Sequence, residues 1–256
     1  MRTRHLTMTI DEFHLMMREP GWKYEYWSGQ AHISPAHRSV STSLDIEPRP
    51  CRSPCRIRPA ESSYEPAMIA AFVAAFRDAI DFFDWEETRI ADAARDNMTG
   101  FFSGERGKPL PESRLALVAD PEVEQESVVG AALVTETKHE SVRLELLFVV
   151  PEWQRMGVAT ALVSAIIEQL YEIGHRTLKS RYNLGNRESR AWHRAFGFVD
   201  DSDLLLAESY YRLAEHELWR RERVGDVTRA ERQKLNLEID RWRVQAEKLR
   251  AAWRAH

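Results

Sequence analysis

The sequence has little cysteine and no long apolar run. Its two cysteines, Cys51 and Cys55, share one Pro/Arg-rich stretch, and no second Cys/His pair at zinc-finger spacing accompanies them. We interpret both as thiols of a reducing cytoplasm and expect no metal site. The start of the chain lacks an apolar run of signal-peptide length, and no stretch approaches the roughly 18 apolar residues of a membrane span. These absences predict a cytoplasmic protein without a membrane partner.

A strong charge of one sign is also missing. The 256 residues carry 36 Lys and Arg against 40 Asp and Glu, a formal net charge of -4. This balance gives no electrostatic reason to expect a nucleic-acid partner. A hydrophobic fraction of 43% and a charged fraction of 30% are those of an ordinary globular protein, long enough for one core plus extensions.

Composition divides the chain into four segments. Residues 1–35 predict an appendage with a short helix over 11–17 and a β-hairpin, whose arms 23–27 and 30–33 flank a Ser28-Gly29 turn. The first seven residues are expected to be a tail or a start-site artefact, because Met8 opens a more natural helix start. Residues 36–54, rich in Ser, Pro and Arg, predict a linker.

The third segment, 55–200, alternates strand and helix patterns. Strands are predicted over 55–58, 113–119, 127–137, 141–150 and 177–182, and helices over 65–83, 85–102, 157–173 and 186–196. This order predicts an α/β (α+β) fold with one mixed central sheet flanked by helices.

The fourth segment, 201–256, predicts a helical hairpin. Apolar residues recur at spacings of three and four in both helices, and Gly225-Asp226 separates them. The expected seam residues are Leu204, Ala207, Tyr211, Ala214, Leu218, Leu235, Ile239, Trp242, Ala246, Leu249 and Trp253. Two arrangements stay open, packing within the chain and a homodimer formed through these helices.

The stretch LELLFVVPEWQRMGVATALVSAII carries a phosphate-binding pattern. An apolar strand ends at Pro151, which has no N–H for the ladder, and a helix begins near Gly157. Free N–H groups and the positive dipole end at a helix N-terminus bind a pyrophosphate. Gly157 and the small Ala159 let the backbone approach the phosphates, and Arg155 adds a charge-assisted contact.

This stretch resembles the GNAT superfamily of acyl-CoA N-acyltransferases. The family turn Gln/Arg-x-x-Gly-x-Gly/Ala is matched by Gln154, Gly157 and Ala159. A second family pattern, Asn-x-x-Ser/Ala followed by Tyr and Gly-Phe, is matched in order and distance within 186–198, except that His193 replaces the Tyr. The resemblance covers about 145 residues and implies acetyl-CoA as co-substrate, without a metal.

The resemblance also implies roles for particular residues. It gives contacts with the pantetheine arm to backbone groups of Phe148, Val149 and Val150. It also gives the pantetheine side of the cleft to Asn186 and Ser189, which are alternatively a helix N-cap and a first-turn polar residue. The pyrophosphate turn would comprise Gln154, Arg155, Met156, Gly157, Val158, Ala159 and Thr160.

Two residues are candidates for proton transfer. His193 stands where many family members carry the Tyr that protonates the leaving thiolate, and an imidazole can do this work near neutral pH. The alternative is a surface histidine beside Trp192. Glu145 is the candidate base for the amine, on the same strand face as Arg143, Leu147 and Val149 by strand alternation. Apolar neighbours would raise its pKa, and the alternative is an ion pair with Arg143.

The sequence gives fewer indications of which residues bind the amine acceptor. In the family the pocket includes the junction of the first two helices, where Asp84 is placed to attract an ammonium and Trp85 to add a cation–π contact. Tyr182 and Trp192 are further candidates near the cleft. The alternative is that the aromatics are core and that Asp84 is the N-cap of the second helix.

The opening residues have a second resemblance. MTIDEFHLMMREPGWKYEYWSGQAHISP is similar to the opening helix and hairpin of a bacterial family of nucleases with a restriction-endonuclease-like fold, matched at Glu25, Gly29, Ser34 and Pro35. The residues that carry nuclease chemistry lie later in that family, so we expect only a structural hairpin. For the whole chain we predict an N-acetyltransferase acting on a primary amine. The alternative is a non-catalytic acyl-CoA-binding module with a helical partner-binding tail.

Overall fold

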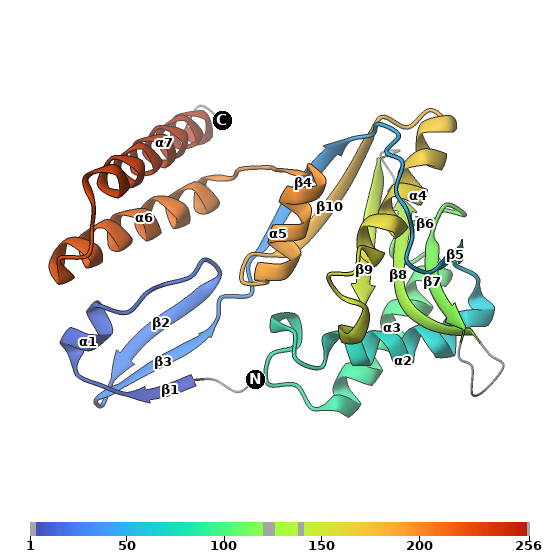
Figure 1. Ribbon diagram of the computed structural model, residues 1–256, viewed down its shortest axis with the longest axis horizontal. Helices are drawn as coiled ribbons and strands as arrows, with labels where there is room; N and C mark the ends of the chain where they lie inside the picture. The colour runs from blue at the N-terminus through green and yellow to red at the C-terminus, as the bar shows by residue number, and fades with distance from the viewer. Residues whose placement is uncertain (1–3, 120–125, 138–140, 255–256) are drawn as a thin grey trace. The chain divides into compact units, whose positions relative to one another are not determined.

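The computed structural model describes residues 4–119, 126–137 and 141–254 (Figure 1). The strands are β1 (Arg4–Thr7), β2 (Trp22–Trp27), β3 (Gln30–Pro35), β4 (Ser39–Asp45), β5 (Arg56–Pro59), β6 (Lys108–Pro109), β7 (Arg114–Ala119), β8 (Glu126–Glu136), β9 (Val142–Val149), β10 (Thr177–Asn183) and β11 (Val199–Asp200). The helices are α1 (Ile10–His14), α2 (Glu65–Phe76), α3 (Glu87–Phe102), α4 (Val158–Glu172), α5 (Arg187–Phe196), α6 (Leu204–Val224) and α7 (Arg229–Arg254). The predicted α/β fold is confirmed.

The helices differ from expectation mainly in where they end. The first predicted helix stops at His14, and the helix expected over 65–83 stops at Phe76, with a 3₁₀ turn over Ile80–Phe82. By their contacts the described residues form two compact units. The first comprises 41–181 and 191–199, and the second comprises 4–40, 182–190 and 200–254.

A mixed sheet forms the centre of the first unit. Its strand order is β11-β4-β10-β9-β8-β7-β5, and β6 pairs with β8 at the side. Residues 39–45 are therefore a strand, which corrects the prediction that all of 36–54 is a linker. The segment SVSTSLD buries Val40, Thr42 and Leu44 in alternation. This period-two alternation is typical of a strand, but the many Ser, Pro and Arg residues of 36–54 favoured the interpretation as a linker.

Helices α2 and α4 cover opposite faces of this sheet. The ring of Phe148 lies 5.7 Å from that of Phe72 on α2. Its neighbour Val149 points the other way, and a Cβ built at Gly130 would meet both Val149 and Leu162 of α4 within 3.4 Å. The core between these layers is continuous and includes Phe72, Phe101, Leu133, Leu162 and Ile166.

The second unit contains the predicted hairpin, which is confirmed. Strands β2 and β3 pair in antiparallel register from Trp22↔Pro35 to Trp27↔Gln30. Ser28 and Gly29 close the turn with φ of 51° and 74°, the left-handed pair that suits a two-residue hairpin. Residues 4–7 are not a tail as expected, because they form β1 and pair with β3. The relation of this segment to the nuclease-like family stays a prediction.

Helices α6 and α7 form an antiparallel hairpin within the chain (Figure 1). The ring of Tyr210 stacks on Trp242 at 4.7 Å, so Tyr210 rather than Tyr211 occupies the seam. Trp253, also expected in the seam, is 77% exposed. Dimerisation through these helices stays a prediction. None of the helices in the described ranges combines the length and apolar character needed to span a bilayer.

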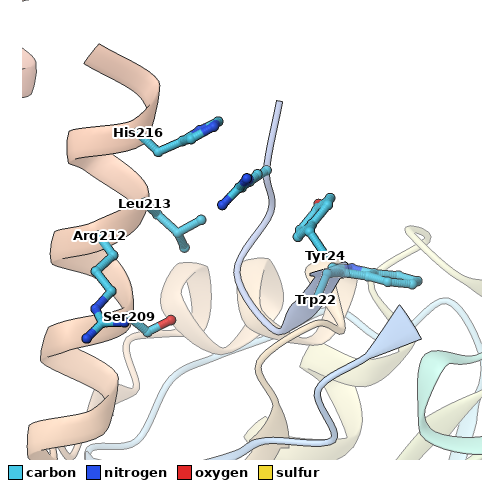
Figure 2. A pocket seen from close by; sticks show the side chains of 7 residues that line it. Trp22, Tyr24, Ser209, Arg212, Leu213 and His216 are labelled. Atoms are coloured by element: carbon cyan, nitrogen blue, oxygen red, sulfur yellow. The ribbon is translucent and has the colours of Figure 1, made fainter. Parts of the chain in front are cut away.

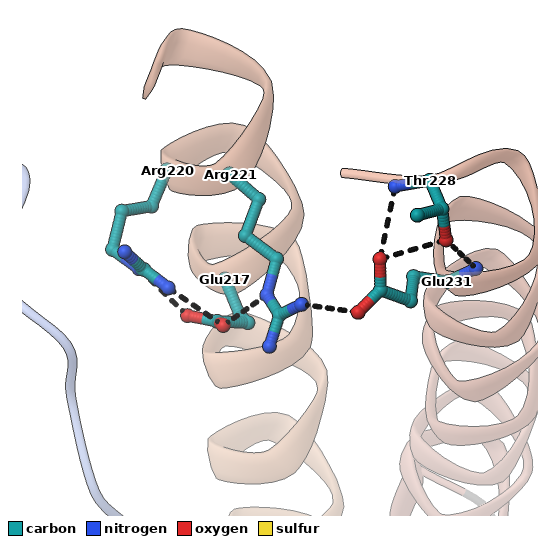
Figure 3. A network of polar contacts seen from close by, with 5 residues as sticks. All are labelled: Glu217, Arg220, Arg221, Thr228 and Glu231. Carbon is teal, nitrogen blue, oxygen red and sulfur yellow. Dashed lines mark hydrogen bonds and ion pairs between the residues drawn. The ribbon is translucent and has the colours of Figure 1, made fainter. Parts of the chain in front are cut away.

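A polar network joins the two helices near their connection (Figure 3). Glu217 accepts hydrogen bonds from Arg220 at 2.9 Å and from Arg221 at 2.6 Å, and Arg221 also bonds Glu231 of α7 at 2.9 Å. Glu231 also forms a capping box with Thr228 at the start of α7. The hydrogen bonds from Arg220 and Arg221 lower the pKa of Glu217 from 4.5 to about 2, against the opposing effect of burial.

Replacing Glu217 with Gln is expected to lower the Tm at neutral pH. Because the folded-state pKa lies below the unfolded value, ionised Glu217 stabilises the fold above pH 4.5, and this contribution is lost as the pH falls toward about 2. Thermal unfolding of Glu217→Gln and wild type should therefore converge on acidification. Glu238→Gln, at an exposed position of α7, is the control. An equal Tm difference at neutral and acidic pH would contradict the linkage.

Candidate active site

Strands β9 and β10 pair for a short distance and then part. Their parallel register, as the structure describes it, holds only Leu178↔Val142 and Lys179↔Arg143. Strand β9 continues to Val149, paired on its other side with β8. The second half of β9 therefore has an edge that faces away from β8 and is not covered by β10.

A β-bulge lies where the two strands part. Leu133 pairs with Leu146 and Val134 pairs with Leu144, so Glu145 is an extra residue on β9. The bulge reverses the alternation beyond it. Arg143 then shares a face with Leu146, whereas Leu147 and Val149 point to the opposite face, because paired residues on adjacent strands share a face. The prediction that Arg143, Leu147 and Val149 lie on one face is therefore wrong.

Glu145 lies between two arginines. Its side chain is 10% exposed, with Oε2 2.9 Å from Arg143 Nε and Oε1 3.6 Å from Arg106 Nη1. The Arg143 Nε is buried and makes no aligned hydrogen bond with the residues that the structure describes, so its contact with Glu145 is an ion pair only. The alternative interpretation of Glu145, an ion pair with Arg143, is therefore confirmed. The contact with Arg106 could not be predicted from strand alternation, because Arg106 lies outside the strand. A base role for Glu145 stays a prediction.

The expected phosphate turn follows β9 directly. Gln154 Nε2 donates to the carbonyl oxygen of Val149 at 3.0 Å and ties the turn to the strand end. Arg155 and Gly157 adopt left-handed φ of 62° and 88°, and nothing lies within 4 Å of a Cβ built at Gly157.

Helix α4 begins directly after this turn. Its first α-helical bond runs from Ala161 N–H to Gly157 O, and no side chain caps the N-terminus. By helix geometry the N–H groups of Val158, Ala159 and Thr160 have no acceptor in their own helix. Left-handed residues before a helix form a concave array of donors that suits an oxyanion. Met156, in the same turn, is 53% exposed.

The backbone groups of 148–150 do not all face the same edge of β9, as contacts of all three residues with a pantetheine arm would require. Val150 N–H donates to Val129 O at 2.9 Å, and a Cβ at Gly130 would lie 2.9 Å from Phe148 O, so both residues direct backbone groups toward β8. Adjacent residues direct theirs to opposite edges. Val149 therefore faces the uncovered edge, and so does Leu147, which the resemblance did not single out.

His193 is buried rather than exposed, which corrects the surface alternative. It is 3% exposed, and its Nε2 lies 3.0 Å from Ser180 Oγ on β10. The ring of Phe198 stands 5.0 Å away, edge-on. The strand pattern of 177–183 signals Ser180 as an inward-facing polar residue. His193 therefore lies against the β10 side of the parted strands, and its role as acid stays a prediction.

Trp192 connects α5 with the phosphate turn. Its Nε1–H donates to Thr160 Oγ1 in the first turn of α4 at 3.3 Å. The indole also stacks on Phe196 with ring centroids 5.1 Å apart. This side chain is half-buried between two helices, so the arrangement gives it a structural role beside the predicted contact with substrate.

Asn186 is an N-cap. The Ser189 N–H donates to Asn186 Oδ1 at 2.9 Å, and Arg190 N–H donates to Asn186 O at 2.9 Å. Asn186 and Ser189 belong to the second unit by their contacts, whereas the turn 154–160 belongs to the first. The cap confirms the alternative for Asn186 and leaves the pantetheine contact a prediction.

The acceptor candidates Tyr182 and Trp85 each make contacts within their own unit. Tyr182 is 4% exposed, packs in the second unit's core and donates from its hydroxyl to Asp200 at 2.8 Å, so it is a core residue rather than a pocket wall. The Trp85 ring is already covered by Arg89, whose guanidinium lies 3.8 Å from its centroid. Asp84 is exposed with φ of 61°, and the N-cap of α3 is Glu86, so the alternative for Asp84 is wrong.

The comparison with protein families identifies the class of this domain. The model of the acetyltransferase (GNAT) family matches residues 71–198, half of the chain. The chain therefore belongs to the GNAT acetyltransferase family, and its matched region is an acyltransferase domain. No match was found among curated proteins.

Several solved structures are similar. One is a GCN5-related N-acetyltransferase from Sphaerobacter thermophilus, at 19% identity and a TM-score of 0.47, covering 64% of this chain and 48% of that one. PaiA N-acetyltransferase from Thermoplasma acidophilum in complex with coenzyme A has 13% identity and a TM-score of 0.45, covering 58% and 92%. The ribosomal-protein-S18-alanine N-acetyltransferase from Escherichia coli has 20% identity and a TM-score of 0.40, covering 57% and 79%. The chain spans about half the length of the first.

Substitutions at Asn186 should separate its two roles. Asn186→Ala is expected to cost about 1 kcal/mol of folding stability, the usual value of an N-cap, whereas Asn186→Ser keeps a capping oxygen and should be nearly neutral. Denaturant unfolding measures both. Weaker acetyl-CoA binding by a fully stable Asn186→Ser variant would indicate a cofactor contact. Unchanged binding would restrict Asn186 to capping.

Proposed function

We propose that this chain is an N-acetyltransferase that moves acetyl from acetyl-CoA to a primary amine by direct attack in a ternary complex. The observation that carries the proposal is the continuity between the uncovered edge of β9 and the N-terminus of α4. Val149 links these two features, because its backbone groups face the uncovered edge of β9 and its carbonyl oxygen accepts a hydrogen bond from Gln154 of the turn before α4. An extended pantetheine arm beside β9 would lead its pyrophosphate to the free donors of α4.

The chemistry follows from this orientation. The amine lone pair attacks the thioester carbonyl carbon, the C–S bond breaks in the collapse of the tetrahedral intermediate, and the sulfur takes up a proton. The ammonium must lose a proton before attack, and the product amide loses the second. We assign proton delivery to sulfur to His193, held by Ser180 at 3.0 Å. We assign proton removal to Glu145 or to a water beside it, at the bulge where β10 leaves β9.

The experiment is coenzyme A release measured with a panel of primary amines. The panel should include small polyamines, amino acids, aminoglycosides and peptide N-termini. We expect amine-dependent release of free thiol, with saturation in both substrates and intersecting initial-rate patterns, as a ternary complex requires. Acetyl-CoA binding without turnover on any amine would instead favour the non-catalytic acyl-CoA-binding module. Parallel initial-rate patterns would contradict direct attack.

Variants of His193 test the proton donor. His193→Ala is expected to lower kcat by about 10²-fold, the lower range for a positioned acid, with little change in KM for acetyl-CoA. His193→Tyr, which restores the family residue, should recover part of the rate and shift its pH dependence. Ser180→Ala removes the hydrogen bond but keeps the imidazole, so it should lower kcat less than His193→Ala does. Unchanged turnover of His193→Ala between about pH 6 and 9 would eliminate the assignment.

A further inference from the structure

A small cavity lies in the second unit, outside the residues that the family model matches. Its volume is about 210 Å³, and it lies between helix α6 and strand β2 (Figure 2). Ser209, Leu213 and His216 extend from the helix toward Trp22 and Tyr24 on the strand, and Arg212 runs along the helix toward Ser209. The lining is completed by Arg18.

Arg18 is half-buried at this cavity, and none of the described carboxylates forms an ion pair with it. Its Nε is buried and has no hydrogen-bond partner among the residues that the structure describes. Its guanidinium lies over ring faces instead, 5.4 Å from the Phe13 centroid and 5.7 Å from that of Tyr24. Burial lowers the pKa of Arg18. A half-buried guanidinium that lacks a carboxylate is costly unless something else supplies the negative charge.

The neighbouring charges reinforce this imbalance. Arg212 lines the same cavity, and the guanidinium of Arg4 lies 5.8 Å from the centroid of Trp22. Glu217, an acid on the same helix, already forms ion pairs with Arg220 and Arg221. Glu19 is exposed, and its backbone N–H donates to the Tyr24 hydroxyl at 2.9 Å.

His216 forms one wall of the cavity. Its Nε2–H donates to the carbonyl oxygen of His14 at 3.0 Å, which fixes the ring against α1. Burial, followed by the charge of Arg18, lowers the pKa of His216. The contribution of Arg18 to this lowered pKa, second to that of burial, shows that its positive charge acts on the His216 side of the cavity.

We propose that this cavity binds the oxyanion group of a small molecule, a phosphate or a carboxylate, between Arg18 and Arg212. The guanidinium fork of Arg18 supplies paired donors, the Ser209 hydroxyl supplies another, and Trp22 with Leu213 gives the non-ionic part of the ligand an apolar surface. The site is separate from the acyl-transfer chemistry and does not depend on it. It would give the appended unit a ligand of its own.

The test is calorimetric titration of the full-length protein with inorganic phosphate and, separately, with acetate, at constant ionic strength. We expect binding in the millimolar range to at least one of them, and the tighter anion identifies the oxyanion class. Arg212→Gln should weaken that binding about tenfold or more, the usual value of a charge-assisted hydrogen bond. Arg18→Lys, which keeps the charge but loses the fork, should weaken it as well.

Arg223→Gln is the matched control, since it removes the same charge from an exposed position of α6 outside the cavity. It should bind as wild type does. Phosphate held only by the turn at α4 would be unaffected by Arg212→Gln, which overturns the proposal. Equal weakening by Arg212→Gln and Arg223→Gln would also overturn it, and so would no binding of either anion at about 10 mM. Since Arg212 is exposed, its variant stays informative even if Arg18→Lys unfolds.

Discussion

Strand β10 stays with β9 for two residue pairs and then follows β4, while β9 stays with β8. Beyond that point β10 pairs with β4 and β9 pairs with β8, so the edges that β9 and β10 turn toward each other form no ladder of hydrogen bonds. The bulge at Glu145 increases the local twist at the point of departure. The turn that ends in α4 is anchored to β9 through Gln154, and α5 is anchored to β10 through His193 and Ser180. The candidate site depends on this parting of two parallel strands.

Much of this arrangement is readable from local sequence, because periodicity and punctuation are local. The apolar spacing of α4, the Pro that ends β9 and the Gly before α4 all predict what the structure contains. Asn186 and Thr228 act as caps within three residues of their partners, so their signals are equally local. Predictions based on such short-range physics are the ones that succeed.

The features that the sequence did not predict depend on contacts between residues far apart in the chain. A bulge depends on the pairing of two strands, so nothing within β9 announces that Arg143 and Leu147 face opposite ways. Arg106 reaches Glu145 from a separate loop. The burial of Tyr182, whose hydroxyl donates to Asp200, was not predictable either. It depends on a second core that residues from distant parts of the chain form together. The strand within 36–54 is not predicted because the Ser-rich composition of this segment is typical of a linker, although Val40, Thr42 and Leu44 alternate as in a strand.

Strand β4 gives the fold a particular order of assembly. Its neighbours in the sheet, β10 and β11, are synthesised more than a hundred residues after it. During translation, β4 must therefore wait as an unpaired strand, and β10 has an open edge until β4 inserts. Non-local pairing of this kind slows folding, and open edges invite association between chains. A ribosome-bound chain would thus depend on chaperones longest at β4. A fragment that begins after β4 and contains only the acyltransferase region would keep the open edge of β10 permanently.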